Sequence, residues 1–430
     1  MTDSVPSCRR QKSGLLVDIL QRIDEAEARV DALESSVRAL LPEDGRFERL
    51  RREARALCER YPRADDRPPL FGVLAGVKDI FHVIGWPTRA GSRLPPDALQ
   101  GPEAGSVTRL RNAGALLLGK TVTTEFAHFM PGPTSNPRNT AHTPGGSSSG
   151  SAAAVAAGFC ELALGTQTIG SIIRPAAFCG VSGLKPSYGR IPADGVIPLA
   201  PSLDHVGCLG ADLDVVTRAA RVLYAAWDDG PMPRRRPVLG IPEGPYLERA
   251  HAGTLDWFES VRRALVDAGY ECRHVRVMAD YDAVCERQQV ILSVEAARVH
   301  AAWFEQYEPR YGSKTADLIR RGQTIANDQL EAALRDRDEF RDGLRRTMID
   351  SGIDAWICPS TTGPAPYGLD STGDPVMNLP WTQAGFPAIN LPAGTHPSGL
   401  PMGLQVVGDW YRDEALLAYA SQIQGSLDRI

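Results

Sequence analysis

The first seventy residues alternate apolar and charged positions at helical spacing. Between residues 13 and 41, apolar side chains recur every three or four positions among Asp, Glu and Arg: Leu16, Ile19, Leu20, Ile23, Val30, Leu33, Val37 and Leu40. This period predicts an amphipathic helix, and an arginine-rich stretch predicts a second helix over 44–60. Prolines then break the pattern. We therefore expect residues 1–69 to form an N-terminal helical segment that packs on the core.

From residue 70 onward, short apolar runs alternate with helical patterns. The runs predict buried strands over 70–80, 115–119, 237–241, 274–278 and 355–358, and alternating strands and turns over 387–407 before a final helix. Helical patterns fill much of the chain between these runs. Such alternation is typical of an α/β fold in which helices cover a mixed central sheet. With no repeat or linker, we predict one continuous α/β/α domain over 70–430, with a variable helical region at about 216–350.

Two long segments rich in small and polar residues interrupt this pattern. Residues 128–151 and 165–198 hold many Gly, Pro and Ser residues, and the run at 151–158 predicts a short helix of small residues. Loops of this length in a compact domain usually carry function. We therefore expect the functional residues to lie in these two segments.

Composition narrows the classes of function. The net charge is −5, which argues against general nucleic-acid binding. No stretch reaches the roughly 18 apolar residues of a membrane span, and the N-terminus has no apolar signal region. Eight scattered cysteines without a C-x-x-C pair indicate free thiols and no zinc site. We expect a cytoplasmic protein that uses neither nucleic acid nor membrane.

Three short motifs match well-known sites in the wrong context. Residues 114–121 fit the phosphate-loop pattern, but the loop positions are apolar and read as a strand. Ser148 lies in a G-x-S-x-G pattern, but no hydrophobic strand precedes it. Ser182 and Lys185 fit S-x-x-K, but Pro186 disfavours the helix that this motif requires. Each motif is better interpreted as ordinary structure.

A longer constellation fits together better. The serine-rich run 145–151 precedes the small-residue helix, and the segments 163–176 and 179–186 follow it, with Lys78 far upstream. Two Ser-Gly loops that flank a short helix can converge at one end of a sheet. Backbone N–H groups near residues 169–171 would then point at one oxygen, as an oxyanion hole requires.

This constellation closely resembles the amidase signature family, over about residues 70–213 and 354 to the end. The resemblance implies that Ser171 is the nucleophile, Ser147 a bridging serine after a cis peptide bond, and Lys78 the base. The spacing agrees, since 171 − 147 = 24. It also implies an oxyanion hole from the N–H groups of Thr168, Ile169, Gly170 and Ser171, with Thr166 and Ser148 as supporting hydrogen-bond partners. No metal or organic cofactor is needed.

The implied chemistry depends on a neutral lysine. Apolar neighbours such as Val73, Val77 and Ile80 would strip water from Lys78 and favour its uncharged form. Neutral Lys78 could then accept a proton from Ser147, which accepts one from Ser171. Ser171 would attack an amide carbonyl, and water would hydrolyse the acyl-enzyme.

The sequence departs from the common family pattern at three places. Gln167 replaces an Asp, and Ile169 replaces a Gly. The branched side chain of Ile169 narrows the pocket and disfavours a positive φ. Arg174 follows the nucleophile by three residues rather than two, which resembles the malonamidase-like branch. There, Arg174 would bind a substrate carboxylate; alternatively, it braces the loop through backbone carbonyls.

Three functions remain open at this stage. The first is an amidase that acts on a small amide, and both a carboxylate-bearing and a neutral substrate are open. The second is a glutamine-hydrolysing subunit of the A type, similar to that of glutamyl-tRNA amidotransferase, which passes ammonia to a partner. The third is a non-catalytic scaffold on the same fold. The N-terminal helix either mediates a homodimer or packs on the core, and Met377 and Trp381 line the pocket or belong to the core.

Overall fold

One ten-stranded mixed sheet organises the protein. The computed structural model describes residues 6–230 and 233–429, with side chains from residue 16 on. The strand order is β2-β1-β3-β5-β4-β9-β10-β8-β6-β7. The strands are β1 (Leu74–Lys78), β2 (Leu116–Thr121), β3 (Leu162–Gln167), β4 (Ser182–Lys185), β5 (His205–Gly210), β6 (Leu239–Glu243), β7 (Cys272–Arg276), β8 (Ala355–Pro359), β9 (Ala388–Thr395) and β10 (Pro401–Gly408). The prediction of an α/β fold with a covered mixed sheet is confirmed.

Parallel pairs lie at both ends of the sheet and antiparallel pairs at its centre. β1 pairs in parallel with β2 and β3, and β6 pairs in parallel with β7 and β8. The pairs from β3 through β5, β4, β9 and β10 to β8 are antiparallel. The central strands are buried along almost their whole length, which explains their small and apolar composition.

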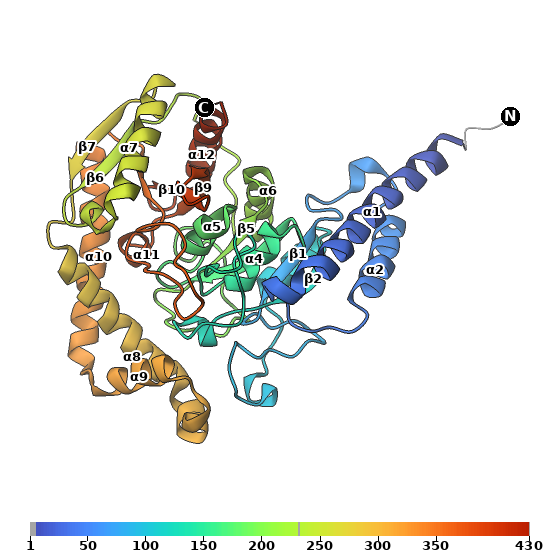
Figure 1. The fold of residues 1–430 in the computed structure, drawn as a ribbon, viewed down its shortest axis with the longest axis horizontal. Coiled ribbons are helices and arrows are strands. Elements are labelled where there is room, and N and C mark those ends of the chain that lie inside the picture. The colour runs from blue at the N-terminus through green and yellow to red at the C-terminus, as the bar shows by residue number, and fades with distance from the viewer. Residues whose placement is uncertain (1–5, 231–232, 430) are drawn as a thin grey trace.

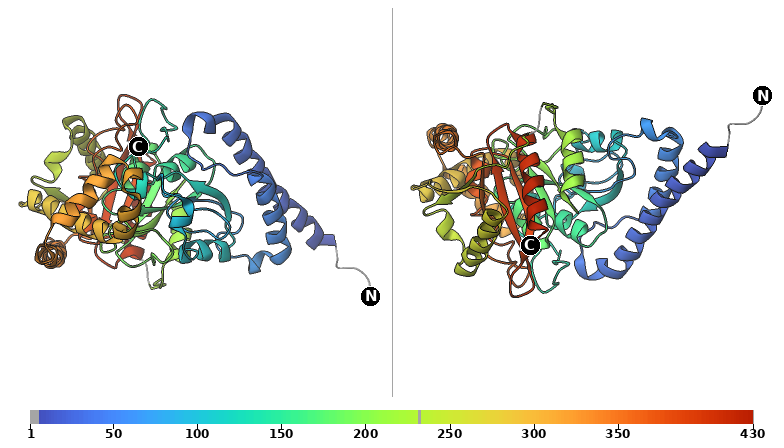
Figure 2. Two further views of the ribbon diagram at one scale, coloured as in Figure 1. Left: turned by 90° about the horizontal axis from the view of Figure 1, so that it is seen from below. Right: turned by 90° about the horizontal axis from the view of Figure 1, so that it is seen from above.

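Helices cover both faces of this sheet (Figures 1 and 2). They are α1 (Pro6–Val37), α2 (Arg46–Arg60), α3 (Gly105–Asn112), α4 (Ser149–Ala156), α5 (Ile173–Cys179), α6 (Leu213–Leu223), α7 (Ala252–Asp267), α8 (Tyr281–Tyr307), α9 (Ser313–Thr324), α10 (Asn327–Asp350), α11 (Leu379–Gln383) and α12 (Asp413–Leu427). Side chains of α3, α6, α7 and α12 share one apolar core, and those of α1, α2, α4 and α5 share another. A third core joins α8, α10 and α11.

The two N-terminal helices lie side by side at the β2 end of the sheet (Figure 1). Their apolar faces are buried, as Ile19, Ile23 and Leu50 show, and they share a cluster with Leu116 and Leu118 of β2. The apolar positions that recur at helical spacing in this segment are therefore the ones that pack against the sheet. α1 extends beyond the rest of the molecule in the views of Figures 1 and 2.

The sequence pattern did not predict the central strands of the sheet. β3, α5 and β4 fall in or next to the Gly- and Ser-rich segment expected to be largely loop, and β5 was not predicted. These elements are short, and β3 and β4 carry Gly, Ser, Thr and Gln where a strand pattern expects branched apolar residues. Their burial comes from neighbours far along the chain, which a local pattern does not record.

The motifs that mislead are ordinary structure. Residues 116–121 of the phosphate-loop pattern form β2, and Lys120 is buried against Asp79, with 2.7 Å between its Nζ and the carboxylate. Lys185 is buried at the end of β4 and donates hydrogen bonds to the carbonyl oxygens of Pro186 and Phe386. All seven cysteines whose side chains are described are free thiols.

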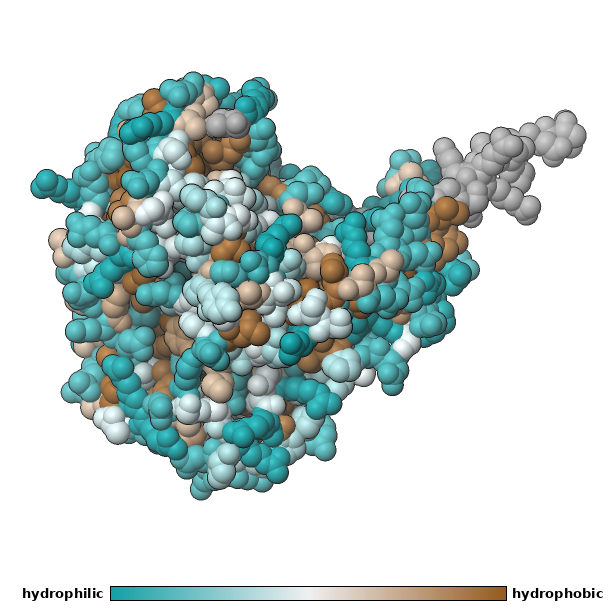
Figure 3. Space-filling view, in the orientation of Figure 1, coloured by the Kyte–Doolittle hydropathy of each residue, from teal (hydrophilic) through white to brown (hydrophobic). Residues whose placement is uncertain are grey.

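The surface is mostly hydrophilic on the face that Figure 3 shows, with hydrophobic residues scattered across it. None of the described helices has the length and apolar character that crossing a bilayer requires. The chemistry is therefore sought inside the molecule, where the small-residue loops meet the sheet.

Candidate active site

Lys78 lies at the end of β1 with its side chain fully buried. Its Nζ is 2.8 Å from Ser147 Oγ and 2.7 Å from Thr166 Oγ1. Burial holds the pKa of Lys78 well below its usual range, while the nearby charge of Asp204 opposes this shift. The lysine, the proposed bridging serine and the supporting threonine therefore form one buried polar cluster.

Ser147 follows a cis peptide bond from Gly146, as the family resemblance implied. Its carbonyl accepts a hydrogen bond from the Thr124 N–H at 3.1 Å. The helix α4 begins two residues later and packs very closely on β2: a Cβ on Gly150 would lie 2.3 Å from the Val122 nitrogen. Small residues in this helix thus allow the serine loop to sit against the sheet.

Ser171 lies in the turn between β3 and α5. In the described part of the chain, the backbone N–H groups of Thr168, Ile169, Gly170 and Ser171 find no hydrogen-bond acceptor. Nearly all buried N–H groups in proteins are paired, so four consecutive free donors beside a serine are an unusual arrangement. They are available to an oxygen that carries negative charge.

The carbonyl groups of the same turn are fixed from outside. Gln288 of α8 donates a hydrogen bond to the Thr168 carbonyl, and Thr382 of α11 donates one to the Ile169 carbonyl at 2.6 Å. The Thr168 hydroxyl donates to the Asp204 carboxylate. With the carbonyls held on one side, the N–H groups are free on the other.

Gln167 has a structural role at the base of this turn. Its Oε1 accepts hydrogen bonds from the N–H groups of Ile172 and Ile173, directly after the nucleophile, and its Nε2 donates to Thr382. The side chain thus connects the start of α5 to α11. A glutamine in place of the family's Asp thus hydrogen-bonds both elements and leaves the N–H groups of residues 168–171 unpaired within the described chain.

The branched side chain of Ile169 does not strain the turn. Ile169 is absent from the described residues with positive φ, so the expected conflict with its side chain does not arise. It lines the pocket over Ser171. Its effect is to narrow that pocket.

Asp204 is a half-buried carboxylate beside the turn. Burial raises its pKa to about 6, although the Thr168 hydroxyl and the N–H groups of Leu199 and Ala200 donate to it. Its charge and the charge of Lys78 stabilise each other. The carboxylate therefore anchors the turn and influences the protonation of the lysine.

Arg174 is buried one helical turn after the nucleophile. Its terminal nitrogens donate to the carbonyl oxygens of Gly373 and Gly146 and to the Thr372 hydroxyl. Burial lowers its pKa to about 10. These are the contacts of an arginine that braces the loop, yet Arg174 also lines the pocket, and its Nε has no partner among the described residues.

The pocket over Ser171 is narrow, with a volume of about 10 Å³. Its lining includes the turn from Thr168 to Ser171, His128 and Phe129, and Leu292 and Pro375. Among the described residues, no group of three or more His, Cys, Asp or Glu side chains could hold a metal ion.

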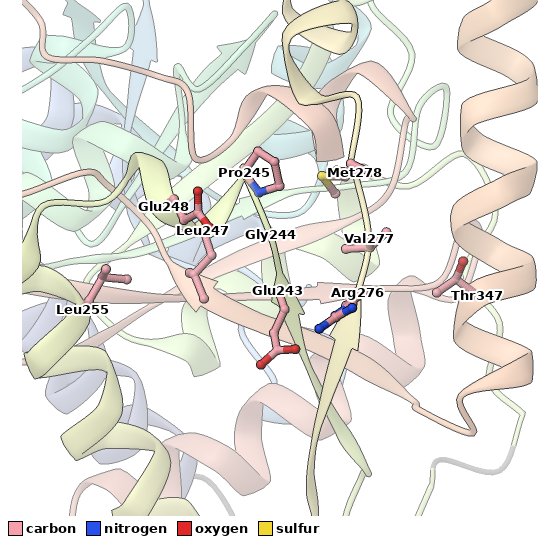
Figure 4. Close-up of a pocket in the computed structure, with 11 residues that line it drawn as sticks. Glu243, Gly244, Pro245, Leu247, Glu248, Leu255, Arg276, Val277, Met278 and Thr347 are labelled. Carbon is pink, nitrogen blue, oxygen red and sulfur yellow. The ribbon is translucent and has the colours of Figure 1, made fainter.

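A far larger cavity lies elsewhere. This cavity has a volume of about 720 Å³ and lies where β6 and β7 end, with Leu255 of α7 and Thr347 of α10 in its lining (Figure 4). Glu243 of β6 and Arg276 of β7 are among the residues that line it. None of the predicted catalytic residues lines this cavity, so size alone does not identify the active site.

The structure brings most of the predicted residues together. Ser148 is buried, donates to the Thr166 carbonyl and accepts from its N–H, which ties the serine loop to β3. Met377 and Trp381 are fully buried with Tyr246, so they belong to the core. The sequence missed Asp204, Gln288, Thr382 and His128. These side chains come from distant segments, and no local motif marked them.

A family model described as Amidase matches residues 21–417. The chain belongs to the amidase family. This confirms the resemblance to the amidase signature family, and as a family member the protein is an enzyme that hydrolyses carbon–nitrogen bonds.

Several curated members of the amidase family are similar over nearly the whole chain. The A-type subunit of the glutamyl-tRNA(Gln) amidotransferase from Synechococcus sp. (strain CC9311) is 31% identical over 99% of this chain and 97% of its own length. The protein of the same name from Anaeromyxobacter sp. (strain K) is 32% identical over 93% of this chain and 91% of its own.

A solved structure described as "Crystal structure of amidase" superposes with a TM-score of 0.84 at 32% identity, and covers 100% of this chain and 99% of that one. The family is thus established by sequence and by fold, while the substrate is not.

Proposed function

We propose that the protein hydrolyses the C–N bond of a small amide through Ser171, Ser147 and Lys78. The observation that carries the proposal is the position of Lys78 Nζ, buried and within hydrogen-bond distance of both Ser147 and Thr166. Burial lowers the pKa of the Lys78 amine, which favours the neutral form that can accept a proton. A surface lysine would have no such role.

The proposed reaction uses the three residues as a proton relay. Lys78 accepts a proton from Ser147, which accepts the Ser171 proton as Ser171 Oγ attacks the amide carbonyl carbon. The N–H groups of residues 168–171 stabilise the oxyanion. When the C–N bond breaks, the relay returns the proton to the leaving nitrogen. Water then adds to the acyl-enzyme, gives its proton to the relay, and releases the acid and a free Ser171.

The proposed substrate is a small amide whose acyl part carries a carboxylate. The narrow pocket and the buried guanidinium of Arg174 support this, as does the likeness of the nucleophile segment to the malonamidase-like branch. The two terminal nitrogens of Arg174 are occupied by the loop. Only its Nε would be free for the substrate, so Arg174 alone would hold a carboxylate weakly.

The test combines covalent labelling with ammonia release. A fluorophosphonate probe should label the wild-type protein and fail to label Ser171→Ala, with the modified peptide mapped by mass spectrometry. Ammonia release should be measured for succinamate and its neutral analogue butyramide. Loss of Ser171 should lower the rate by a factor of 10⁴ or more, roughly as for other serine nucleophiles.

Two results would contradict the proposal. Labelling at Ser148 instead of Ser171 would favour the nucleophile-elbow interpretation. Absence of labelling and of ammonia release with every amide would favour a non-catalytic scaffold. Lys78→Arg serves as a matched variant, because an arginine keeps a long side chain with N–H donors but stays protonated and cannot act as the base.

A second candidate is the glutamine-hydrolysing component of an amidotransferase. The observation that favours it is the similarity to the A-type subunits of glutamyl-tRNA(Gln) amidotransferases over almost the full chain. This candidate uses the same nucleophile but requires L-glutamine as substrate and a partner protein that receives ammonia. Glutaminase activity that rises when a copurified partner is added would support it over the small-amide proposal.

A further inference from the structure

His128 lines the same pocket as Ser171 and plays no part in the proposed proton relay. It follows the short helix η3 (Glu125–Ala127) and lines the same pocket as Ser171 and Arg174. Its ring stands 4.9 Å from that of Phe129, and the Arg174 guanidinium lies 5.9 Å from the Phe129 ring centre. His128 and Arg174 therefore both neighbour Phe129 and both line the pocket.

The imidazole of His128 has unused hydrogen-bonding capacity. Within the described structure neither ring nitrogen is hydrogen-bonded, and Nδ1 is buried without a partner. The nearby His300, in contrast, pairs its Nδ1 with the Tyr311 hydroxyl. A buried ring nitrogen without a partner costs free energy unless a ligand satisfies it.

The backbone holds His128 firmly in this place. Phe126 and Ala127, the two residues before it, have φ of 48° and 59°, the left-handed region that non-glycine residues avoid. The His128 carbonyl accepts a hydrogen bond from the Thr124 hydroxyl, and its N–H donates to the Glu125 carbonyl. Glu125 in turn accepts from the N–H of Gly312. Such strain persists where the surroundings enforce a functional position.

Charges around the pocket suit an anionic group. Lys314 lies close enough to lower the pKa of His128, which burial, the larger cause, brings to about 4. The ring is therefore neutral at pH 7 and carries one N–H donor. Arg174 is the cation that lines the pocket, and Asp374 is the acidic group that acts on it.

We infer that His128 binds the substrate carboxylate together with Arg174 Nε, with one hydrogen bond from each side chain. This inference rests on the proposed function and assigns a residue that fixes the substrate class. Because the terminal nitrogens of Arg174 already serve the loop, a second donor is required, and His128 is the pocket-lining side chain with a free one. The carboxylate would then hold the amide carbonyl over Ser171.

The test compares His128→Leu, His128→Asn and Phe129→Leu on succinamate and butyramide. His128→Leu should raise KM for succinamate about tenfold or more with little change in kcat, since it removes a hydrogen bond to a charged group. KM for butyramide should hardly change. His128→Asn keeps an N–H and should restore much of the affinity. Phe129→Leu trims the same pocket without removing a polar atom and should affect both amides alike.

A second readout does not depend on catalysis. Succinate binding to Ser171→Ala should weaken about tenfold in Ser171→Ala/His128→Leu, measured by titration calorimetry. Equal changes with succinamate and butyramide, or unchanged succinate binding, would overturn the inference. Failure of the proposed function looks different: the wild-type protein would then release no ammonia from either amide.

Discussion

Lys78 is the residue in which stability and activity conflict. It is fully buried on a strand, where an ammonium group loses its hydration and gains only two hydroxyl partners and the distant charge of Asp204. Such a group is costly in the folded state. The same cost makes the amine a base, because burial favours the neutral form.

The pH dependence of stability should reveal this cost. Between the lowered pKa of folded Lys78 and its ordinary 10.5, the folded protein binds fewer protons than the unfolded chain. Stability from this group therefore rises with pH across that window. The free energy of unfolding of the wild type minus that of Lys78→Met should increase from about pH 6 to about pH 9 in urea denaturation.

Activity gives the matching result for the same variant. Lys78→Met should lower kcat by about 10²–10⁴-fold, the usual contribution of a general base. A difference in unfolding free energy that stays flat with pH would mean that Lys78 titrates normally. This outcome would contradict the proposal that Lys78 is the base.

At the scale of elements, β1 and β2 are joined by a buried ion pair as well as by their ladder. Lys120 of β2 and Asp79, just after β1, lie with only 4% and 1% of their side chains exposed. Burial lowers the pKa of Lys120 and raises that of Asp79. Loss of hydration thus exceeds the attraction between them, and the pair contributes geometry more than stability.

Removing one partner of this pair should lower the free energy of unfolding more, per group removed, than removing both partners together. Lys120→Met leaves the Asp79 carboxylate buried without its cation and should reduce the free energy of unfolding by about 3–5 kcal/mol. Asp79→Asn/Lys120→Met should cost clearly less than the sum of its two single variants. A double-mutant cycle by chemical denaturation measures both, and additive single effects would show that the two groups act independently.

Local sequence patterns predicted the elements whose own residues carry an apolar period or a continuous apolar run. The amphipathic α2 and the apolar runs of β1, β2 and β8 could be predicted, because each carries its own periodicity or continuous apolar residues. β4, with the sequence Ser-Gly-Leu-Lys, could not. Its place at the centre of the sheet depends on β5 and β9, and nothing within four residues encodes that.

At the scale of the whole molecule, the candidate active site is assembled from segments that lie far apart along the chain. The motif residues Lys78, Ser147 and Ser171 could be predicted because the family resemblance names them. The side chains that hold the turn could not, since Gln288 and Thr382 lie more than 100 residues downstream of Ser171 and reach it only through packing. The variable helical region thus acts on the catalytic turn through α8.

Gln288 tests this long-range support. Gln288→Leu removes the hydrogen bond to the Thr168 carbonyl, so the oxyanion N–H groups lose a fixed orientation. We expect kcat to fall about ten- to hundredfold with a small change in KM, because slight misplacement of reacting groups is costly. The half-buried neighbour Gln289→Leu is the matched control. Equal kcat in the two variants would show that α8 does not position the turn.

The strand order also has a consequence for biosynthesis. β4 pairs with β9, which begins more than 200 residues later at Ala388. At roughly 5–20 residues per second, a ribosome needs about 10–40 s to make the intervening chain. During this interval the nascent N-terminal half presents the open edge of β4 to its surroundings, and open strand edges recruit other chains. Half-made polypeptides of this enzyme therefore depend on shielding until translation reaches the strand that completes the sheet.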